Sequence, residues 1–203
     1  MKKRIFINMT AIFVVFMFAT QSFALTGTKT FTVSASVPAA TGIVINASKV
    51  DSTSNQFTLL TGTALSFNPM TFNSVNSIYL PGHYFAIDVG SAGGAGIPDV
   101  TVTYTEGTNP NNPGHGLGWK TTATFVKVVG TTETQLASHG PKKLLKDLSN
   151  EQIGFIEVVG GFLRIYVGII PGGTNVPAGG EPFTNSDNPG TYEGTLFISA
   201  TVA

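Results

Sequence analysis

The 203-residue chain contains no cysteine, and this absence excludes several functional classes. A thiolate metal site, a redox-active cysteine pair and a cysteine nucleophile all need a side chain that the sequence does not have. Disulfide bonds are excluded as well. An exported form of this protein therefore depends for its stability on its own core or on neighbouring subunits.

Charged residues are also scarce. They make up 11% of the chain, where about a quarter is usual, and the 11 basic side chains are matched by 11 acidic ones. A chain with so little positive charge has no electrostatic means of holding nucleic acid or an anionic membrane. We therefore expect no nucleic-acid partner, and no membrane partner once the leader segment described next has been removed.

Long hydrophobic runs are missing, and the main apolar stretch is short and lies near the start of the chain. Basic residues at positions 2–4 precede an apolar run over 11–19, and small residues follow at Ser22 and Ala24. The run is too short to span a bilayer. This order predicts a secretory signal peptide that is cleaved after Ala24, and an uncleaved membrane anchor is the alternative.

Helical periodicity is nearly absent, and alternating strand patterns take its place. Apolar and polar residues alternate with period two in most segments, which are rich in Val, Ile, Thr, Phe and Tyr. Stretches rich in glycine and proline separate these segments and predict loops. The expected strands cover residues 31–37, 42–47, 56–60, 77–80, 83–89, 99–105, 122–129, 153–159, 162–170 and 196–202.

One segment has helical spacing. Leu144, Leu145 and Leu148 form a narrow apolar stripe within residues 141–152, which begin with proline, so we expect one short surface helix there. Many short strands with turn signals between them predict an all-β fold, an immunoglobulin-like or related β-sandwich. The expected organisation is a signal peptide (1–24), an N-terminal extension (25–41) and one β-sandwich domain (42–203).

The sequence contains no constellation of catalytic or ligand-binding residues with suitable spacing. His83, His115 and His139 lack partners at metal-ligand spacing, and we expect His115 and His139 to be solvated loop residues. The glycine-rich stretch at 90–96 lacks the lysine and the following helix of a phosphate-binding loop. Trp119 and the tyrosines lie in separate segments, so we interpret them as core anchors rather than a sugar-stacking platform. We expect no enzyme activity, no cofactor and no metal.

The two ends of the expected mature chain carry similar alternating segments, FTVSASV at 31–37 and LFISATV at 196–202. A β-sandwich that lacks one strand has an open groove and unpaired edges, and a strand from a neighbouring subunit fills such a groove in donor-strand complementation. The first segment follows the cleavage site closely, so it is placed to act as a donor strand. Its apolar positions are Phe31, Val33, Ala35 and Val37, and those of the second segment are Leu196, Ile198, Ala200 and Val202.

The opening FTVSASVPAATGIVI and the ending PGTYEGTLFISATV resemble subunits of chaperone–usher fimbriae, and most closely the colonisation-factor (alpha-type) major pilins. Gly190 is the fourteenth residue from the C-terminus, where many fimbrial subunits have a glycine. The penultimate residue is Val202, where most such subunits have an aromatic residue. The matching positions are Thr32, Val33, Ala35, Ser36 and Val37 in the opening, and Gly190, Tyr192 and Gly194 in the ending.

This resemblance implies a structural subunit of an extracellular surface filament (a fimbria or pilus) that polymerises by donor-strand complementation. It implies export through the periplasm to the cell surface, with copies of the chain, a periplasmic chaperone and an outer-membrane usher as partners. The N-terminal strand would be the donor, and the C-terminal strand would border the acceptor groove. The alternative is a monomeric secreted or cell-surface β-sandwich, an adhesin or carbohydrate-binding module, whose first and last strands pair within one chain.

Overall fold

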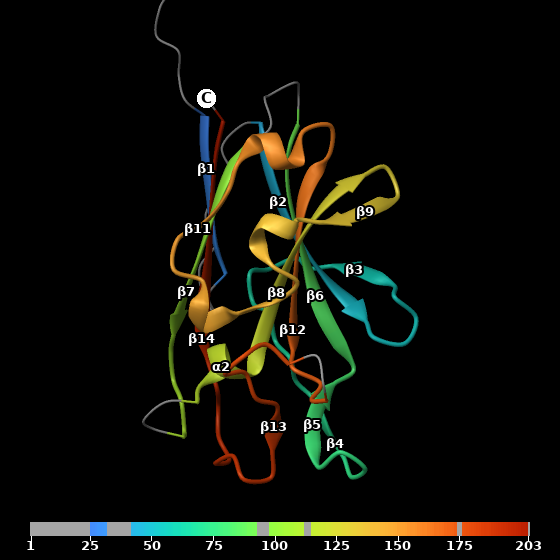
Figure 1. Cartoon of the computed structure of the whole chain (residues 1–203), viewed down its shortest axis with the longest axis vertical. Coiled ribbons are helices and arrows are strands. Elements are labelled where there is room, and N and C mark those ends of the chain that lie inside the picture. The colour runs from blue at the N-terminus through green and yellow to red at the C-terminus, as the bar shows by residue number, and fades with distance from the viewer. Residues whose placement is uncertain (1–24, 32–41, 93–97, 112–114, 174–175, 203) are drawn as a thin grey trace, which may run out of the picture.

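Antiparallel strands make up most of the structure, a computed structural model in which they form an elongated sandwich (Figure 1). The predicted all-β class is therefore confirmed. The predicted signal peptide and most of the predicted donor strand lie outside the described part of the chain. The structure describes residues 25–31, 42–92, 98–111, 115–173 and 176–202.

One layer is a four-stranded sheet with β14 (Gly194–Val202) inside it and β1 (Leu25–Phe31) at one edge. On its other side β14 pairs with β7 (Asp99–Glu106), which in turn pairs with the short edge strand β11 (Glu151–Ile153). The buried side chains of β14 alternate, as the period-two pattern of its sequence requires. These buried residues are Leu196, Ile198, Ala200 and Val202.

The second layer is a larger sheet, and most of its strands coincide with segments in which apolar and polar residues alternate in the sequence. Its strand β8 (Thr121–Val129) pairs with the short strand β9 (Thr132–Gln135), which lies outside the order of neighbouring strands given next. That order is β10 (Lys143–Leu144), β8, β12 (Phe162–Ile169), β6 (His83–Ser91), β2 (Ile43–Asp51) and β3 (Phe57–Leu59).

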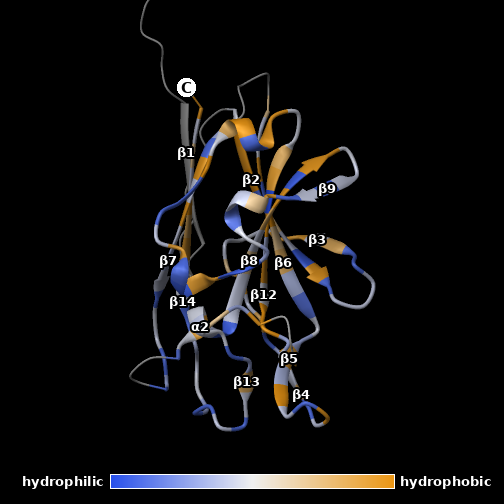
Figure 2. Cartoon of the chain, in the orientation of Figure 1, coloured by the Kyte–Doolittle hydropathy of each residue, from blue (hydrophilic) through white to orange (hydrophobic). Residues whose placement is uncertain are grey.

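The core fills the space between the two layers. Ile198 and Val102 of the four-stranded sheet belong to the same buried cluster as Phe85, Phe125 and Ile165 of the larger sheet. Burying side chains of this size stabilises the fold by about 1.5–3 kcal/mol each. Figure 2 shows the hydrophobic residues recurring along the strands that face this core. A sandwich without disulfide bonds is therefore held by a continuous apolar interior.

One end of the sandwich, the lower end in Figure 1, carries a small third sheet. Its strands are β13 (Phe183–Thr184), β5 (Ile78–Pro81) and β4 (Met70–Asn73). The one-turn helix α2 (Leu117–Lys120) leads into β8 near the same end.

The helix predicted over residues 141–152 is not formed. The segment contains β10, the single 3-10 turn η2 (Leu145–Asp147) and β11. Leu144, Leu145 and Leu148 are at most 3% exposed, because the segment runs between the two sheets and contributes its leucines to the core. Tertiary burial thus overrides the helical spacing, which is a weak local preference.

Candidate functional site

β14 has a different kind of partner on each side. Its register with β7 covers eight residue pairs, and its register with β1 covers seven, from Leu25 opposite Val202 to Phe31 opposite Leu196. Both pairings are antiparallel, so the chain leaves β1 near the start of β14. Within the described part of the chain β14 is the only strand that pairs with β1, which makes β1 an edge strand.

The strand on this edge is not the segment with the clearest alternation. Of the four predicted donor residues, Phe31 lies in β1 and is paired opposite Leu196. Val33, Ala35 and Val37 lie outside the described residues. Two positions before Phe31, the register sets Lys29 opposite Ile198, a fully buried residue of β14.

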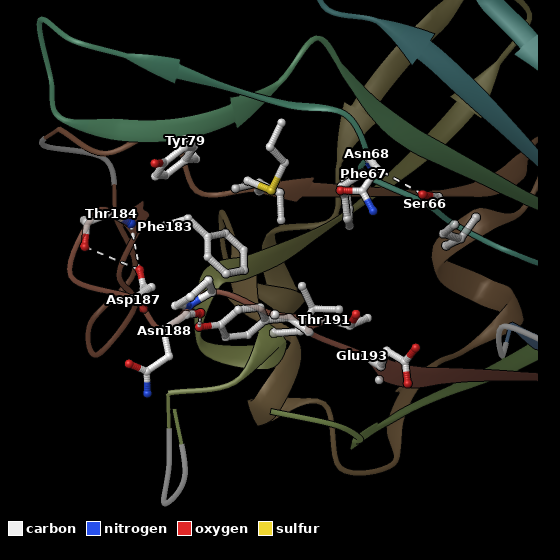
Figure 3. A pocket seen from close by; sticks show the side chains of 18 of the residues that line it. Ser66, Phe67, Asn68, Tyr79, Phe183, Thr184, Asp187, Asn188, Thr191 and Glu193 are labelled. Atoms are coloured by element: carbon white, nitrogen blue, oxygen red, sulfur yellow. Dashed lines mark hydrogen bonds between the residues drawn. The ribbon is translucent and has the colours of Figure 1, made fainter. Parts of the chain in front are cut away.

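A pocket of about 730 Å³ opens where β14 begins (Figure 3). Phe67, Tyr79, Phe183 and Tyr192 supply aromatic walls, and residues 190–194 form one side. The volume lies within the usual range of about 300–1,000 Å³ for ligand sites. Sequence reasoning missed this pocket because loops that are distant in sequence line it. The aromatic residues in the proline- and glycine-rich stretch before β14 were the available signal.

The Gly-x-Tyr-x-Gly motif forms this side of the pocket. Gly190 has a φ of +151°, and a Cβ there would lie 2.7 Å from Cγ of Pro110, so both conformation and space favour glycine. The hydroxyl of Tyr192 donates a hydrogen bond to the carbonyl oxygen of Asn188 at 2.8 Å. The Tyr192 ring packs edge-on against Phe183, with centroids 4.9 Å apart.

Gly194, the last glycine of the motif, lies against the ring of Tyr104. A Cβ at Gly194 would lie 2.1 Å from Oη of Tyr104, so only glycine fits without a rearrangement. That hydroxyl donates a hydrogen bond to Oε1 of Glu106 at 3.0 Å. Burial, together with the charge of Glu106, raises the pKa of Tyr104 far above its ordinary value. The start of β14 is therefore fixed by close packing against β7.

A buried ion pair fixes the loop that forms the wall of the pocket. Lys120 is 1% exposed, and its Nζ lies 2.7 Å from Oδ1 of Asp187. The Asp187 carboxylate also accepts hydrogen bonds from the Thr184 backbone N–H and from Nδ2 of Asn111. Burial raises the pKa of Asp187, but the hydrogen bonds from Lys120, Thr184 and Asn111 outweigh it and hold the pKa below its ordinary value. Asp187 is thus an anchored carboxylate with its oxygens already engaged.

The histidines lie in three different environments. His115 is exposed, as predicted, and pairs with Glu181. The expectation that His139 is a solvated loop residue is wrong, because it is 6% exposed and lies between two carboxylates. Its Nδ1 lies 2.5 Å from Oε1 of Glu151, and its Nε2 lies 3.1 Å from Oε1 of Glu157. His83 is buried, with Nε2 2.8 Å from the carbonyl oxygen of Ser66.

The geometry of this region suits recognition of a strand and of an apolar group. Across the described ranges, no three or more His, Asp or Glu side chains gather as metal ligands would. No helix in those ranges is long and apolar enough to cross a membrane. The candidate binding features of the described residues are therefore the β14 edge and the aromatic pocket at the start of β14.

The chain was also compared with known proteins. Comparisons with protein-family models, with curated proteins and with solved structures gave no match. The basis for a functional assignment is therefore the sequence together with the geometry of the β14 edge and its pocket.

Proposed function

We propose that this protein is a structural subunit of an extracellular surface filament whose copies are joined by donor-strand complementation, without catalysis. The observation that carries the proposal is the match between the alternating apolar positions of residues 31–37 and the buried positions of β14, whose edge pairs with an N-terminal strand in antiparallel register. An edge that accepts this strand within one chain accepts the same strand from a neighbouring copy. Export through the periplasm with a chaperone and an outer-membrane usher is part of the proposal.

The register favours exchange between copies. In the lone chain Lys29 stands opposite the buried residue Ile198. A shift of six residues is even, so it keeps the faces of the strand unchanged. It would set four apolar residues of the segment opposite the four buried residues of β14. In that register Phe31, Val33, Ala35 and Val37 stand opposite Val202, Ala200, Ile198 and Leu196, respectively.

The length of the chain limits this shift within one molecule. β2 begins at Ile43, at the end of the sandwich where β14 ends (Figure 1). In the shifted register Val37 would stand opposite Leu196, about 20 Å away along the sheet. Ile43 also belongs to the other sheet, about 10 Å away, so the straight-line distance is about 22 Å. The six residues from Val37 to Ile43 reach at most about 20–22 Å when fully extended, which leaves no slack for a turn. A strand from another copy is free of this limit, so the apolar register suits pairing between copies.

Substitutions on the two faces of the donor segment test the proposal. Val33→Asp would bury an unpaired carboxylate and is expected to abolish filaments. Ser34→Asp, on the opposite face, carries the same charge and is the matched control. Filaments are sheared from the producing cells and quantified by electron microscopy and gel electrophoresis. Equal polymerisation of both variants, or a wild-type protein that stays monomeric, would overturn the proposal.

A second candidate function is the monomeric surface binding module. The observation that favours it is that β1 already pairs with β14 in its own chain. The aromatic pocket would then hold a ligand, and a saccharide fits its mixed aromatic and polar lining. A printed glycan array probed with wild-type protein and Tyr192→Ala tests this function. Binding by a monomeric wild type that is lost in Tyr192→Ala supports the module over the filament.

A further inference from the structure

An exposed apolar surface lies at the upper end of the sandwich. The 3-10 helix η3 (Phe155–Val158) and the next residue expose three large apolar side chains, at 46% for Phe155, 72% for Ile156 and 52% for Val159. We name these three residues the η3 patch. Figure 2 shows this stretch as hydrophobic at the end opposite β13. Single exposed apolar residues are common, but three together mark a contact surface.

The η3 patch is held in place by polar contacts. The backbone N–H of Phe155 donates to Oδ1 of Asp99 at 2.7 Å. Glu157 accepts a hydrogen bond from Ser138 at 2.5 Å and also lies beside the buried His139. Little order is therefore lost when a partner covers the patch.

The patch and the pocket lie at opposite ends of β14. Asp99, which anchors η3, pairs with Thr201 near the end of β14. The pocket is lined by residues 190–194, at the start of that strand. Nine residues of β-strand separate the two features, which corresponds to about 30 Å.

The direction of the strand on β14 decides which ends of two copies meet. A donated strand that runs as β1 does leaves the acceptor at the start of β14, which is the pocket end. The donor chain then enters its own sandwich at Ile43, which pairs with Ser91. Ser91 lines the same shallow depression as Gly161, and Gly161 is two residues after Val159 of the η3 patch. Ile43, the partner of Ser91, therefore lies near the η3 patch. The pocket end of the acceptor therefore faces the η3 end of the donor.

We propose that the η3 patch of each copy is seated in the aromatic pocket of the next copy along the filament. This inference rests on the proposed function and adds a second contact that the donated strand does not supply. The aliphatic side chains of Ile156 and Val159 match a pocket walled by Phe67, Tyr79, Phe183 and Tyr192. Because the two surfaces differ, the contact is head-to-tail, which is the type of interface that an open filament needs.

The absence of native cysteine allows a direct test by crosslinking. Ile156→Cys is combined in turn with Thr191→Cys, Ser66→Cys or Asn185→Cys, all on the pocket lining. A disulfide forms only when the two Cβ atoms come within about 3.5–4.5 Å, so three positions sample the pocket wall. The matched control combines Ile156→Cys with Leu59→Cys, which is 63% exposed on β3, outside the pocket lining. Filaments are oxidised and run on a non-reducing gel.

A ladder of covalent multimers is expected from at least one pocket pair, and from neither the control pair nor Ile156→Cys alone. Filaments that give no ladder with any pocket pair, or an equal ladder with the control, overturn this inference and leave the proposed function intact. Dimers from Ile156→Cys alone indicate a symmetric contact and also overturn it. A wild type that forms no filaments overturns both proposals. In a separate measurement, Ile156→Asp is expected to lower the temperature at which filaments dissociate, and Leu59→Asp is not.

Discussion

The two edges of the four-stranded sheet, β1 and β11, are held in different ways. β1 pairs with β14 over seven residues, from Leu25 to Phe31. β11 pairs with β7 over only three residues, but Ile153 is 1% exposed in the core. Glu151 of β11 also accepts a hydrogen bond from Lys143 at 2.6 Å and lies 2.5 Å from Nδ1 of His139.

The three-residue pairing of β11 shows that a short edge strand can be held firmly by contacts outside its backbone ladder. The shorter strand is tied to its surroundings by core burial and by charged side chains, and the proposed function makes the longer one the strand that copies exchange. We therefore regard β11 as the fixed edge and β1 as the exchangeable one. The predictions below test this distinction, from the largest expected effect to the smallest.

A substitution in β14, the strand that connects β1 to the rest of the four-stranded sheet, is expected to have the largest effect on the free energy of unfolding. Ile198 is fully buried in β14, and Ile198→Asp would place an unpaired carboxylate in the core. We expect this variant to lose more than about 4 kcal/mol of stability. Phe197→Asp, on the outer face at 36% exposure, is the control and is expected to lose only about 1–2 kcal/mol. Urea unfolding compares the two, and equal losses would mean that the inner face of β14 is assigned wrongly.

Amide hydrogen exchange of the isolated subunit compares the two edges directly. β11 opens only with the core, so the Ile153 amide is expected to exchange at the rate of global unfolding. Amides of β1 are expected to exchange at least about 100-fold faster, because that edge opens locally. Equal protection of β1 and β11 would contradict the idea of an exchangeable edge.

Removing the histidine beside β11 weakens the fixed edge. His139→Ala would leave Glu151 and Glu157 without a shared partner. Both carboxylates are partly exposed, so the expected loss is about 1–3 kcal/mol, below that of a fully buried pair. His115→Ala is the control, because its side chain is 56% exposed and it pairs with Glu181 in solvent, where about 1 kcal/mol or less is expected. Thermal unfolding at pH 7 measures both variants.

Acid pH gives the smallest effect, again at β11. Burial raises the pKa of Glu151, but hydrogen bonds from Lys143 and His139 outweigh it and bring the pKa below its ordinary value of 4.5. The hydrogen bond from Ser138 lowers the pKa of Glu157; burial opposes this and His139 assists it. A lowered pKa in the folded state contributes stability above pH 4.5 that is lost as pH falls through the folded-state value.

The expected loss at this edge is no more than about 1 kcal/mol, because both carboxylates are in contact with solvent. Urea midpoints of the wild type and of Glu151→Gln are measured from pH 7 down to pH 3. The variant is expected to show the shallower decline below pH 4.5. An identical decline in both proteins would mean that the Glu151 interactions do not stabilise the fold.

Local alternation predicted the long strands well. Each of the strands β6, β7, β12 and β14 has one face in the core. Successive side chains of a strand point to opposite faces, so apolar and polar residues alternate in the sequence of such a strand. The all-β class followed from these segments and from the glycine and proline between them. The Gly-x-Tyr-x-Gly motif was noticed in the sequence only through its resemblance to a known family. Its close contacts, such as that of Gly194 with Tyr104, could not be predicted without the folded structure.

Features made by distant segments were not predictable from local patterns. The leucines of residues 141–152 have helical spacing, but the space between the sheets imposes an extended path on them. His139 lies next to glycine and serine in the sequence, and only the fold brings Glu151 and Glu157 to it. The pocket likewise needs loops from both halves of the chain.

If the chain forms the proposed filament, the pairing of β1 with its own β14 has a consequence for the concentration at which copies associate. A strand joined to its site by a segment as short as residues 32–41 is present there at an effective concentration on the order of millimolar. A neighbour at micromolar concentration competes at a disadvantage of about a thousandfold, or about 4 kcal/mol. The apolar register must supply more than this difference. A subunit that folds alone therefore closes its own edge first, and assembly favours a subunit whose edge is kept open until the next copy arrives.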